Sequence, residues 1–477
     1  MKDNGRRQLI AWDKRYVWHP FTQQAEWEKD DPLVVRSGKG VYLKDMNGRR
    51  YMDGVSSLWV NVHGHRHPVL DRAVTDQLGK IAHSTFLGLT HEPAVRLARE
   101  LIRIAPRGLQ RVFYSDNGAT SVEIALKMAF QSWAQSGRRG RTEFLALDHS
   151  YHGDTLGSVS VGGIGLFHRK FAPLLFKTRF AMSPFCYRCP CRAGGYRGRW
   201  RGPVEKIQGI PRPGDRRAET GCRWECLKHA EQLMREHASH LAAAIVEPVV
   251  QGAAGMVVMP PGYLKGFERL CRKYGILLIA DEVATGFGRT GTMFACERER
   301  VRPDFLCVSK SITGGYLPLA ATLTTEKVYR SFRGRYDEFK TFFHGHTYTA
   351  NPLACAVALA NLRLYRKDDV VGGLEGKIRM LGDFLRGMRS HPSVGDVRQA
   401  GLMAGIELVK DQRTGRPFEA ALKVGQRVCR ECRNQGVWVR PLSDVIVILP
   451  PLSIRSGQLR RLLSVVGRAI VQVTKML

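Results

Sequence analysis

The fold is decided by residues 303–315, PDFLCVSKSITGG, in the second half of the chain. The apolar part of this stretch predicts a short buried strand, and Lys310 follows it at the start of a glycine-rich turn. A second apolar run, at 275–280, predicts another strand that ends at Asp281. A lysine held away from water loses its proton more easily and becomes a nucleophile. The two strands therefore indicate a site with a reactive amine and a carboxylate.

An amine and a carboxylate at the ends of two strands meet the needs of one cofactor, pyridoxal 5'-phosphate (PLP). The Lys310 amine would bind the aldehyde of PLP covalently, and Asp281 would keep the pyridine nitrogen protonated so that the ring can accept electrons. Because many lysines follow strands, this interpretation needs support from the surrounding sequence.

Strand-like runs alternate with helical runs, which predicts an α/β fold with a mainly parallel central sheet flanked by helices. Strands are expected at 112–115, 143–147, 243–247, 275–281, 304–308 and 319–324, and helices at 122–133 and 350–365. From residue 366 the elements are shorter and mixed, with strands expected at 437–440 and 445–449. We therefore predict a large domain at 61–365 and a small α+β domain at 366–477, with the segment 1–60 joined to the small domain.

The composition is that of a globular protein, with 477 residues of which 44% are hydrophobic. The first twenty residues contain no apolar signal segment, and no apolar run approaches membrane-spanning length, so we expect a cytoplasmic protein without membrane contact. Lys and Arg number 74 against 43 Asp and Glu, a net charge of +31. The excess is spread along the chain and no nucleic-acid motif accompanies it, so compositional bias is favoured over nucleic-acid binding.

Two groups of metal-ligating residues stand out. Five cysteines lie in an Arg- and Cys-rich stretch, about 185–226: Cys186, Cys189, Cys191, Cys222 and Cys226. Their spacing permits a zinc site, and a cysteine-rich surface insertion is the alternative. His63, His65 and His67 alternate, so they would point the same way on an extended strand, or they lie in a turn near the site. Neither group has a standard ligand pattern, and we predict no metal.

A glycine turn precedes the helix expected at 122–133. In residues 116–120, DNGAT, the backbone N–H groups of Gly118 and Ala119 would face outward at the positive end of the helix dipole, which suits a phosphate group. A simple helix cap is the alternative. Tyr151 follows the strand expected at 143–147, where its ring would stack on a planar cofactor or pack in the core.

The most specific stretches are 281–291, DEVATGFGRTG, and 309–315, SKSITGG. Together they resemble the class III aminotransferases, a family of fold-type I PLP enzymes. Matching stretches extend the resemblance over nearly the whole chain: WHPFT at 18–22, DGVSS at 53–57, GDT at 153–155, QGA at 251–253 and HGHT at 344–347. The resemblance implies the fold-type I architecture and PLP as the cofactor.

The resemblance also implies roles for residues around the cofactor. Lys310 would carry PLP and move a proton to and from the substrate carbon, while Asp281 would bind the pyridine nitrogen. Gly118 and Ala119 would hold the phosphate, and Tyr151 would stack on the ring and touch the substrate.

Other implied roles concern the substrate and a partner chain. Gly345, His346 and Thr347 would reach the site from the second subunit of an obligate homodimer, with Thr347 on the phosphate. Arg440 would bind the substrate carboxylate through two parallel hydrogen bonds, and Arg289 is a further candidate contact.

The activity that the resemblance implies is transamination of 8-amino-7-oxononanoate to 7,8-diaminononanoate, a step of biotin synthesis, with S-adenosylmethionine as the leading amino donor. Phe21 and Leu58, both expected at the substrate, stand where family members that use this donor have a tyrosine and a tryptophan. Lysine as donor therefore remains an alternative, as does another ω-amino-acid or diamine transaminase. A nucleic-acid-binding protein on an enzyme scaffold would not need Lys310, Asp281 and Thr347 together.

Overall fold

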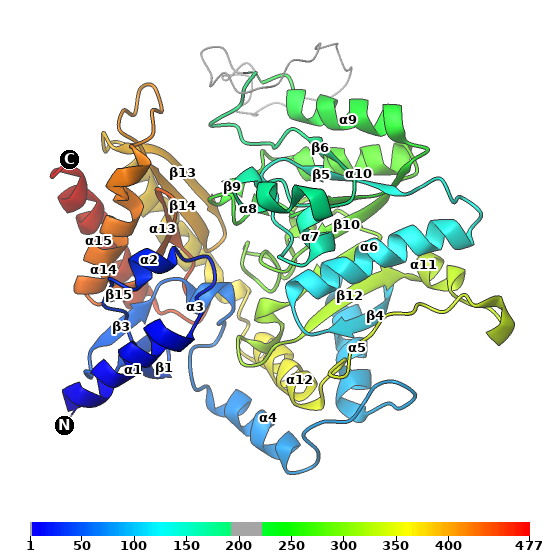
Figure 1. The fold of residues 1–477 in the computed structure, drawn as a ribbon, viewed down its shortest axis with the longest axis horizontal. Helices are drawn as coiled ribbons and strands as arrows, with labels where there is room; N and C mark the ends of the chain where they lie inside the picture. The colour runs from blue at the N-terminus through cyan, green and yellow to red at the C-terminus, as the bar shows by residue number, and fades with distance from the viewer. Residues whose placement is uncertain (1, 192–221) are drawn as a thin grey trace.

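The computed structural model describes residues 2–191 and 222–477, and its centre is a seven-stranded sheet (Figure 1). The strand order is β4-β12-β11-β10-β7-β5-β6. In that order the bounds are Leu109–Ser115, Ala320–Thr325, Phe305–Val308, Leu277–Asp281, Leu241–Val246, Glu143–Leu147 and Thr178–Ala181. The strand β12 is antiparallel to both of its neighbours, and the other neighbouring pairs are parallel. The predicted α/β fold with a mainly parallel sheet is confirmed.

Both faces of this sheet are buried. Alternate strand residues point to opposite sides, and helices cover each side. On one face, Ile245, Ile279 and Phe305 pack in a cluster with apolar residues of α6 (Gly118–Gln135). On the other face, alternate residues of the same strands belong to the main core, together with side chains of further helices. These helices are α5 (Glu92–Ile104), α9 (Glu225–His237), α10 (Tyr263–Lys273) and α12 (Pro352–Lys367). The sheet is therefore a middle layer between helices.

The C-terminal domain contains a four-stranded antiparallel sheet in the order β13-β14-β17-β16. Its strands span Val394–Ala400, Met403–Leu408, Val445–Ile448 and Arg440–Leu442, and its helices are α13 (Glu375–Met388), α14 (Val424–Asn434) and α15 (Ser456–Thr474). The single strand expected at 437–440 is wrong in one respect: the chain breaks at Val439 into β15 (Val437–Trp438) and β16. Each piece pairs with a different sheet.

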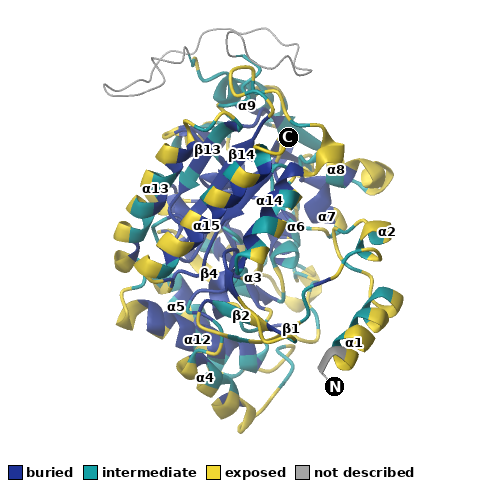
Figure 2. Cartoon of the chain, turned by 90° about the vertical axis from the view of Figure 1, so that its left-hand side faces the viewer, coloured by how far each residue is buried: buried dark blue, intermediate teal, exposed yellow. Residues whose placement is uncertain are grey.

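The N-terminal segment contributes α1 (Lys2–Tyr16), α2 (Gln24–Trp27) and the strands β1 (Val35–Lys39), β2 (Tyr42–Asp45) and β3 (Arg50–Asp53). The strand β3 pairs in parallel with β15, so β1, β2 and β3 of the N-terminal segment form one small sheet with a strand of the C-terminal domain. The predicted domain boundaries at residues 60 and 365 stay predictions. Figure 2 shows interior strands such as β14 buried, with exposed faces on outer helices such as α4 (Pro68–Leu78) and α13. No helix in the described part of the chain is long and apolar enough to cross a membrane.

A buried ion network connects the C-terminal sheet to the rest of the molecule. Arg398 on β13 donates to Glu407 Oε2 at 2.5 Å and to Asp396 Oδ2 at 3.0 Å. The same guanidinium donates twice to the carbonyl of Gly255, between β8 (Val250–Gln251) and β9 (Val257–Val258). Glu407 also accepts from Arg188 at 2.7 Å. Buried charges of this kind are tolerated only while each one is paired.

Removing Arg398 should therefore cost more stability than removing an exposed arginine. Arg398→Met leaves Glu407 and Asp396 without their shared partner, and we expect the free energy of unfolding to fall by about 3 kcal/mol. Arg386→Met removes an exposed helix pair with Asp383 and should change it by less than about 0.5 kcal/mol. Urea unfolding of the two variants tests the difference; equal losses would contradict it.

Candidate active site

A cavity of about 720 Å³ lies at the carboxyl ends of the central strands. It brings together five residues predicted from the sequence: Lys310, Asp281, Tyr151, Gly118 and Ala119. The strands β10 and β11 are parallel neighbours, with Asp281 opposite Cys307, so the residues that end both strands reach the same edge of the sheet.

Lys310 follows β11 after one residue, Ser309, and begins a 3-10 turn, Lys310–Thr313, with a left-handed backbone (φ 47°). Burial of its amine lowers the pKa of Lys310, while the nearby carboxylates of Asp281 and Glu247 raise it. The amine nitrogen lies 5.4 Å from the centre of the Trp59 ring. Since burial is the largest cause, the net effect favours the neutral, nucleophilic amine.

Asp281 is buried at the end of β10 and held by two contacts. His152 Nδ1 lies 2.7 Å from Asp281 Oδ2, and the backbone N–H of Val283 donates to Oδ1 at 3.0 Å. His152 is itself buried, and its Nε2 has no hydrogen-bond partner among the described residues. The carboxylate is thus fixed in orientation, as a group that must face a cofactor atom would be.

Glu247 is a second buried carboxyl group beside the cavity, and the sequence analysis did not identify it as a site residue. Its two oxygens accept from the backbone N–H groups of Tyr151 (3.0 Å) and Gly252 (2.9 Å). Burial raises the pKa of Glu247 to about 7, helped by the charge of Asp281 and opposed by His152 and by these backbone donors. The sequence did contain a signal for Glu247 as a site residue: it is the last residue of the strand expected at 243–247, just as Asp281 is the last residue of β10.

The first turn of α6 forms one wall of the cavity. Asn117 caps the helix by accepting from the Thr120 N–H at 3.0 Å, and the amides of Gly118 and Ala119 lie in the first turn, where a helix offers them no internal partner. A Cβ atom at Gly118 would lie 2.5 Å from Val283, so only glycine lets the helix approach β10 this closely. This narrow cradle suits an anion such as phosphate.

Three aromatic rings lead from the surface toward the cavity. Phe21 lies 5.3 Å from Phe167, edge to face, and Phe167 lies 6.3 Å from Tyr151 at nearly a right angle. The Tyr151 hydroxyl donates to Asp154 at 2.7 Å, and burial raises the pKa of Tyr151. Phe167, on the short helix α8 (Gly165–His168), was not predicted, and no pattern in the sequence marks it.

The other predicted site residues lie outside the lining of this cavity. Gly345 and Thr347 are exposed in one chain, and His346 is half-buried, with Nε2 4.0 Å from Asp116 Oδ1. Arg440 is half-buried at the start of β16 and Leu58 is 44% exposed.

Arg289 is fully buried, and its guanidinium donates to the carbonyls of Pro450 (2.9 Å) and Asn61 (2.7 Å). These hydrogen bonds tie the end of β17 to the segment before α4. The guanidinium predicted as a substrate contact thus donates its hydrogen bonds to backbone carbonyls.

The candidate metal ligands are placed differently from one another. His63 Nε2 lies 2.9 Å from Asn361 Oδ1, whereas His65 Nε2 lies 3.1 Å from Asp53 Oδ2.

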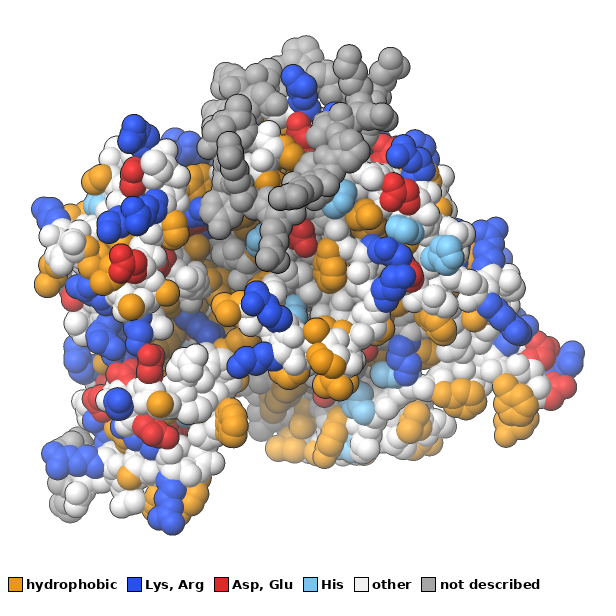
Figure 3. All heavy atoms as spheres, turned by 45° about the horizontal axis from the view of Figure 1, so that its top comes forward, with side chains coloured by type: hydrophobic (Ala, Val, Ile, Leu, Met, Phe, Trp, Pro, Cys, Tyr) orange, Lys and Arg blue, Asp and Glu red, His pale blue; other side chains and the backbone are white. Residues whose placement is uncertain are grey.

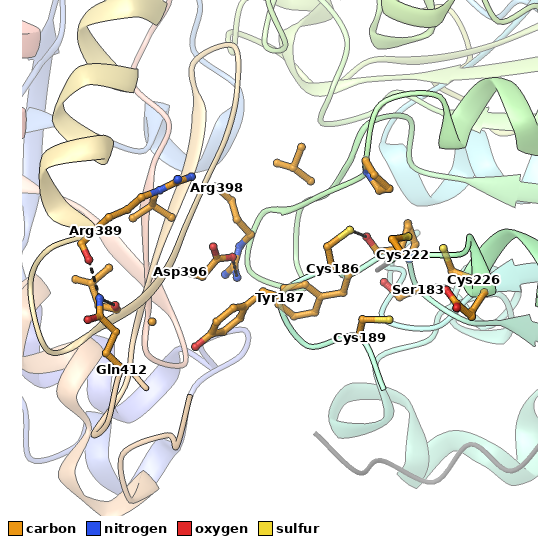
Figure 4. A pocket seen from close by; sticks show the side chains of 18 residues that line it. Ser183, Cys186, Tyr187, Cys189, Cys222, Cys226, Arg389, Asp396, Arg398 and Gln412 are labelled. Atoms are coloured by element: carbon orange, nitrogen blue, oxygen red, sulfur yellow. Dashed lines mark hydrogen bonds and ion pairs between the residues drawn. The ribbon is translucent and has the colours of Figure 1, made fainter. Parts of the chain in front are cut away.

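Four of the cysteines line a second cavity of about 560 Å³: Cys186, Cys189, Cys222 and Cys226. Figure 4 shows these four residues on the opposite side of the cavity from Asp396 and Arg398 of the C-terminal sheet. Within residues 2–191 and 222–477, no three His, Cys, Asp or Glu side chains are arranged to hold a metal ion. The rest of the expected insertion, 192–221, lies outside the described residues.

Comparison with known proteins identifies the class. Residues 23–470 match the family model described as Aminotransferase class-III, so the chain belongs to this family. Class III aminotransferases depend on PLP, and the resemblance seen in the sequence is confirmed.

Similar proteins include the adenosylmethionine-8-amino-7-oxononanoate aminotransferase of Geobacter sulfurreducens, which is 49% identical over 99% of this chain and 100% of its own length. The crystal structure of the protein of that name from Methanocaldococcus jannaschii is 40% identical and superposes with a TM-score of 0.89 over 98% of this chain and 99% of its own. An omega transaminase of Pseudomonas jessenii in complex with PMP is 28% identical, with a TM-score of 0.88 over 98% of both chains.

The charge of Asp281 should be measurable at the Lys310 amine. In Asp281→Asn apoenzyme the neighbouring anion is lost, so we expect the pKa of Lys310 to fall further, by about one unit. The pH dependence of Lys310 labelling by an amine-selective reagent, read by peptide mass spectrometry, would shift to lower pH. Asp304→Asn is the control. Asp304 is a half-buried carboxylate at the opposite end of β11 from Lys310, where it accepts a hydrogen bond from the Leu278 N–H. An unshifted Asp281→Asn profile would contradict the assigned geometry.

Proposed function

We propose that this chain transfers an amino group to the C7 ketone of 8-amino-7-oxononanoate, giving 7,8-diaminononanoate in biotin synthesis, with S-adenosylmethionine as the leading amino donor. The observation that carries the proposal is the meeting of Lys310 and Asp281 at one cavity, in a chain that is about half identical to relatives named for this reaction over nearly its full length. We place the reaction in the cytoplasm, without a nucleic-acid or membrane partner.

The described residues fit PLP. Lys310 supplies a buried amine for the aldehyde, Asp281 a fixed carboxylate for the ring nitrogen, and the amides of Gly118 and Ala119 a cradle for the phosphate. Tyr151 supplies an aromatic face at the wall of the cavity. When bound, PLP supplies an electron sink for the carbon atom that loses or gains the amino group.

The protein's own residues would then hold and move protons. Burial lowers the pKa of Lys310 and so favours the neutral amine, whose Nζ can take a proton from the substrate carbon and return it. Asp281 would direct its carboxylate to the ring nitrogen, and His152 holds Oδ2 in place. Trp59 and Val283 line the cavity with apolar surface and exclude water from the reacting atoms.

Substrate binding requires residues beyond this cavity. We assign Arg440 to the carboxylate of the acceptor, and Phe21 and Leu58 to the walls of its binding channel. The edge contacts that join Phe21 through Phe167 to Tyr151 support a continuous apolar path, as a long aliphatic acceptor requires.

We further propose a homodimer with two shared active sites, in which Gly345, His346 and Thr347 of each chain complete the site of the other. In one chain Gly345 and Thr347 are exposed, and their neighbours Phe343 and Tyr348 expose 75% and 61% of their surface. Large exposed aromatic residues of this kind favour an interface.

A nucleic-acid-binding role has less support. Figure 3 shows lysine and arginine side chains scattered over the visible face among acidic and apolar ones. On this face, the described residues form no continuous basic track for a phosphate backbone.

The alternative donor, lysine, is favoured by one specific observation. Phe21 lacks the hydroxyl group and Leu58 the indole that the resemblance associates with S-adenosylmethionine use. Turnover of the nonanoate with each donor, alongside 4-aminobutyrate and ornithine as substrates of other ω-transaminases, separates these possibilities.

Covalent trapping tests the cofactor assignment. After borohydride reduction of the holoenzyme, the adduct should be found on Lys310, and Lys310→Ala should lose both the adduct and the visible absorbance of the cofactor. Lys377 provides an internal control, because burial also lowers its pKa but its amine donates to the carbonyl of Leu452. An adduct on Lys377, or none on Lys310, would contradict the assignment.

Donor choice should respond to the two channel residues. In the double variant Phe21→Tyr/Leu58→Trp, we expect kcat/KM for S-adenosylmethionine to rise by about tenfold, because a hydroxyl group and an indole ring become available to an adenosyl group. The KM for the nonanoate is the control and should change little. If the wild-type enzyme already prefers S-adenosylmethionine and the variant gains nothing, these positions do not set donor choice.

A further inference from the structure

The segment that leads into the active site from β3 has an unusual backbone. Ser56, Ser57, Leu58 and Trp59 are consecutive, none is glycine, and all have positive φ, at 51°, 41°, 66° and 72°. The N–H of Trp59 bonds to the carbonyl of Val55 at 2.7 Å, as in an α-helical turn. The turn α3 (Ser56–Trp59) is therefore left-handed, which costs about 1–2 kcal/mol per L-residue. A turn of this hand must be held by its surroundings.

Asp53 is the group that holds it. The side chain is fully buried at the end of β3, and its Oδ1 accepts from the Ser57 N–H at 2.8 Å. Its Oδ2 accepts from the Ser57 hydroxyl at 2.7 Å and lies 3.1 Å from His65 Nε2. One carboxylate thus binds both polar groups of a residue in the middle of the turn. His65, from the alternating histidine motif, completes the coordination of that carboxylate.

The two ends of the turn are fixed by other residues. The Ser56 hydroxyl donates to the carbonyl of Leu449 at 2.6 Å. Arg289 donates to the carbonyl of Asn61 at 2.7 Å, and Asn61 Nδ2 lies 3.3 Å from His65 Nδ1. The bonds of Ser56 to Leu449 and of Arg289 to Asn61 are made without Asp53, whereas both bonds to the polar groups of the central residue Ser57 come from its carboxylate.

The turn determines where Trp59 lies. Its ring lines the active-site cavity at 5.4 Å from the Lys310 amine, and a Cβ atom at Gly252 would meet the ring at 3.2 Å. The indole N–H is buried and has no hydrogen-bond partner among the described residues. A change of hand at residues 57–59 would turn this side chain away from Lys310, since the direction of Cβ follows the backbone dihedrals.

We propose that Asp53 is a positioning residue of the active site. By holding the left-handed turn, its carboxylate keeps the Trp59 ring against the amine of Lys310, shielding that amine from water and limiting its movement. This inference rests on the proposed function for its effect on turnover, but the shielding of Lys310 is a property of the chain alone.

The test compares Asp53→Ala with Asp45→Ala. Asp45 is a matched control, because it also ends a strand of the same sheet, is buried, and accepts from a backbone N–H (Arg49, 2.8 Å) and a side-chain hydroxyl (Tyr51, 3.0 Å). In apoenzyme, labelling of Lys310 by an amine-selective reagent should become several-fold faster in Asp53→Ala and stay unchanged in Asp45→Ala. In holoenzyme, kcat/KM should fall by about tenfold or more in Asp53→Ala alone.

Glycine provides a rescue, because it adopts positive φ without strain. Adding Ser57→Gly to Asp53→Ala should slow Lys310 labelling back toward the wild-type rate. If Asp53→Ala does not fold, Ser57→Ala removes one hydrogen bond to the same carboxylate and should accelerate labelling in the same direction.

The inference is overturned if Asp53→Ala and Asp45→Ala accelerate labelling equally, if neither changes it, or if the glycine brings no recovery. Labelling does not depend on turnover, so it gives a result even if the wild-type enzyme fails to use the nonanoate. Failure of the proposed function is thus distinguishable from failure of this inference.

Discussion

The parallel pairing of β10 with β11 is the interaction on which the active site depends. It sets Asp281 opposite Cys307 and so brings the end of one strand beside the turn that carries Lys310. Because side chains alternate along a strand, a shift of one residue in this register would send Asp281 to the other face of the sheet. The helices on both faces prevent such a shift, since each face is filled by apolar side chains that would have to exchange places.

The hydrophobic pattern of the sequence was sufficient to predict where most strands of the central sheet begin and end. The strand expected at 143–147 matches β5 at both ends, and those expected at 275–281 and 304–308 differ from β10 and β11 only at their first residues. The direction of β12 was beyond the reach of the sequence, because a buried strand has the same apolar run whichever way it points. The break at Val439 was missed for a related reason: it depends on which sheet each half of the segment joins.

The site was predictable where chemistry and strand ends coincide, as at Lys310 and Asp281. His152 and Phe167 act through contacts made only in the folded chain, 129 positions away from Asp281 in the first case. The left-handed turn gave no local signal, since Ser, Leu and Trp are not residues that favour positive φ. Roles for Phe21, Leu58, Arg440 and residues 345–347 came from family resemblance, and none of them lines the cavity of the single chain.

The close approach of Gly118 to Val283 links two positions that are far apart in the chain. Any side chain at 118 meets the branched side chain at 283, so a larger residue at the first position is acceptable only after a smaller one has appeared at the second. During divergence the order of the two replacements would therefore matter. If position 118 changed before position 283, the intermediate protein would have a displaced α6 helix. The opening of α6 and the residue two places after Asp281 should thus evolve as a single unit.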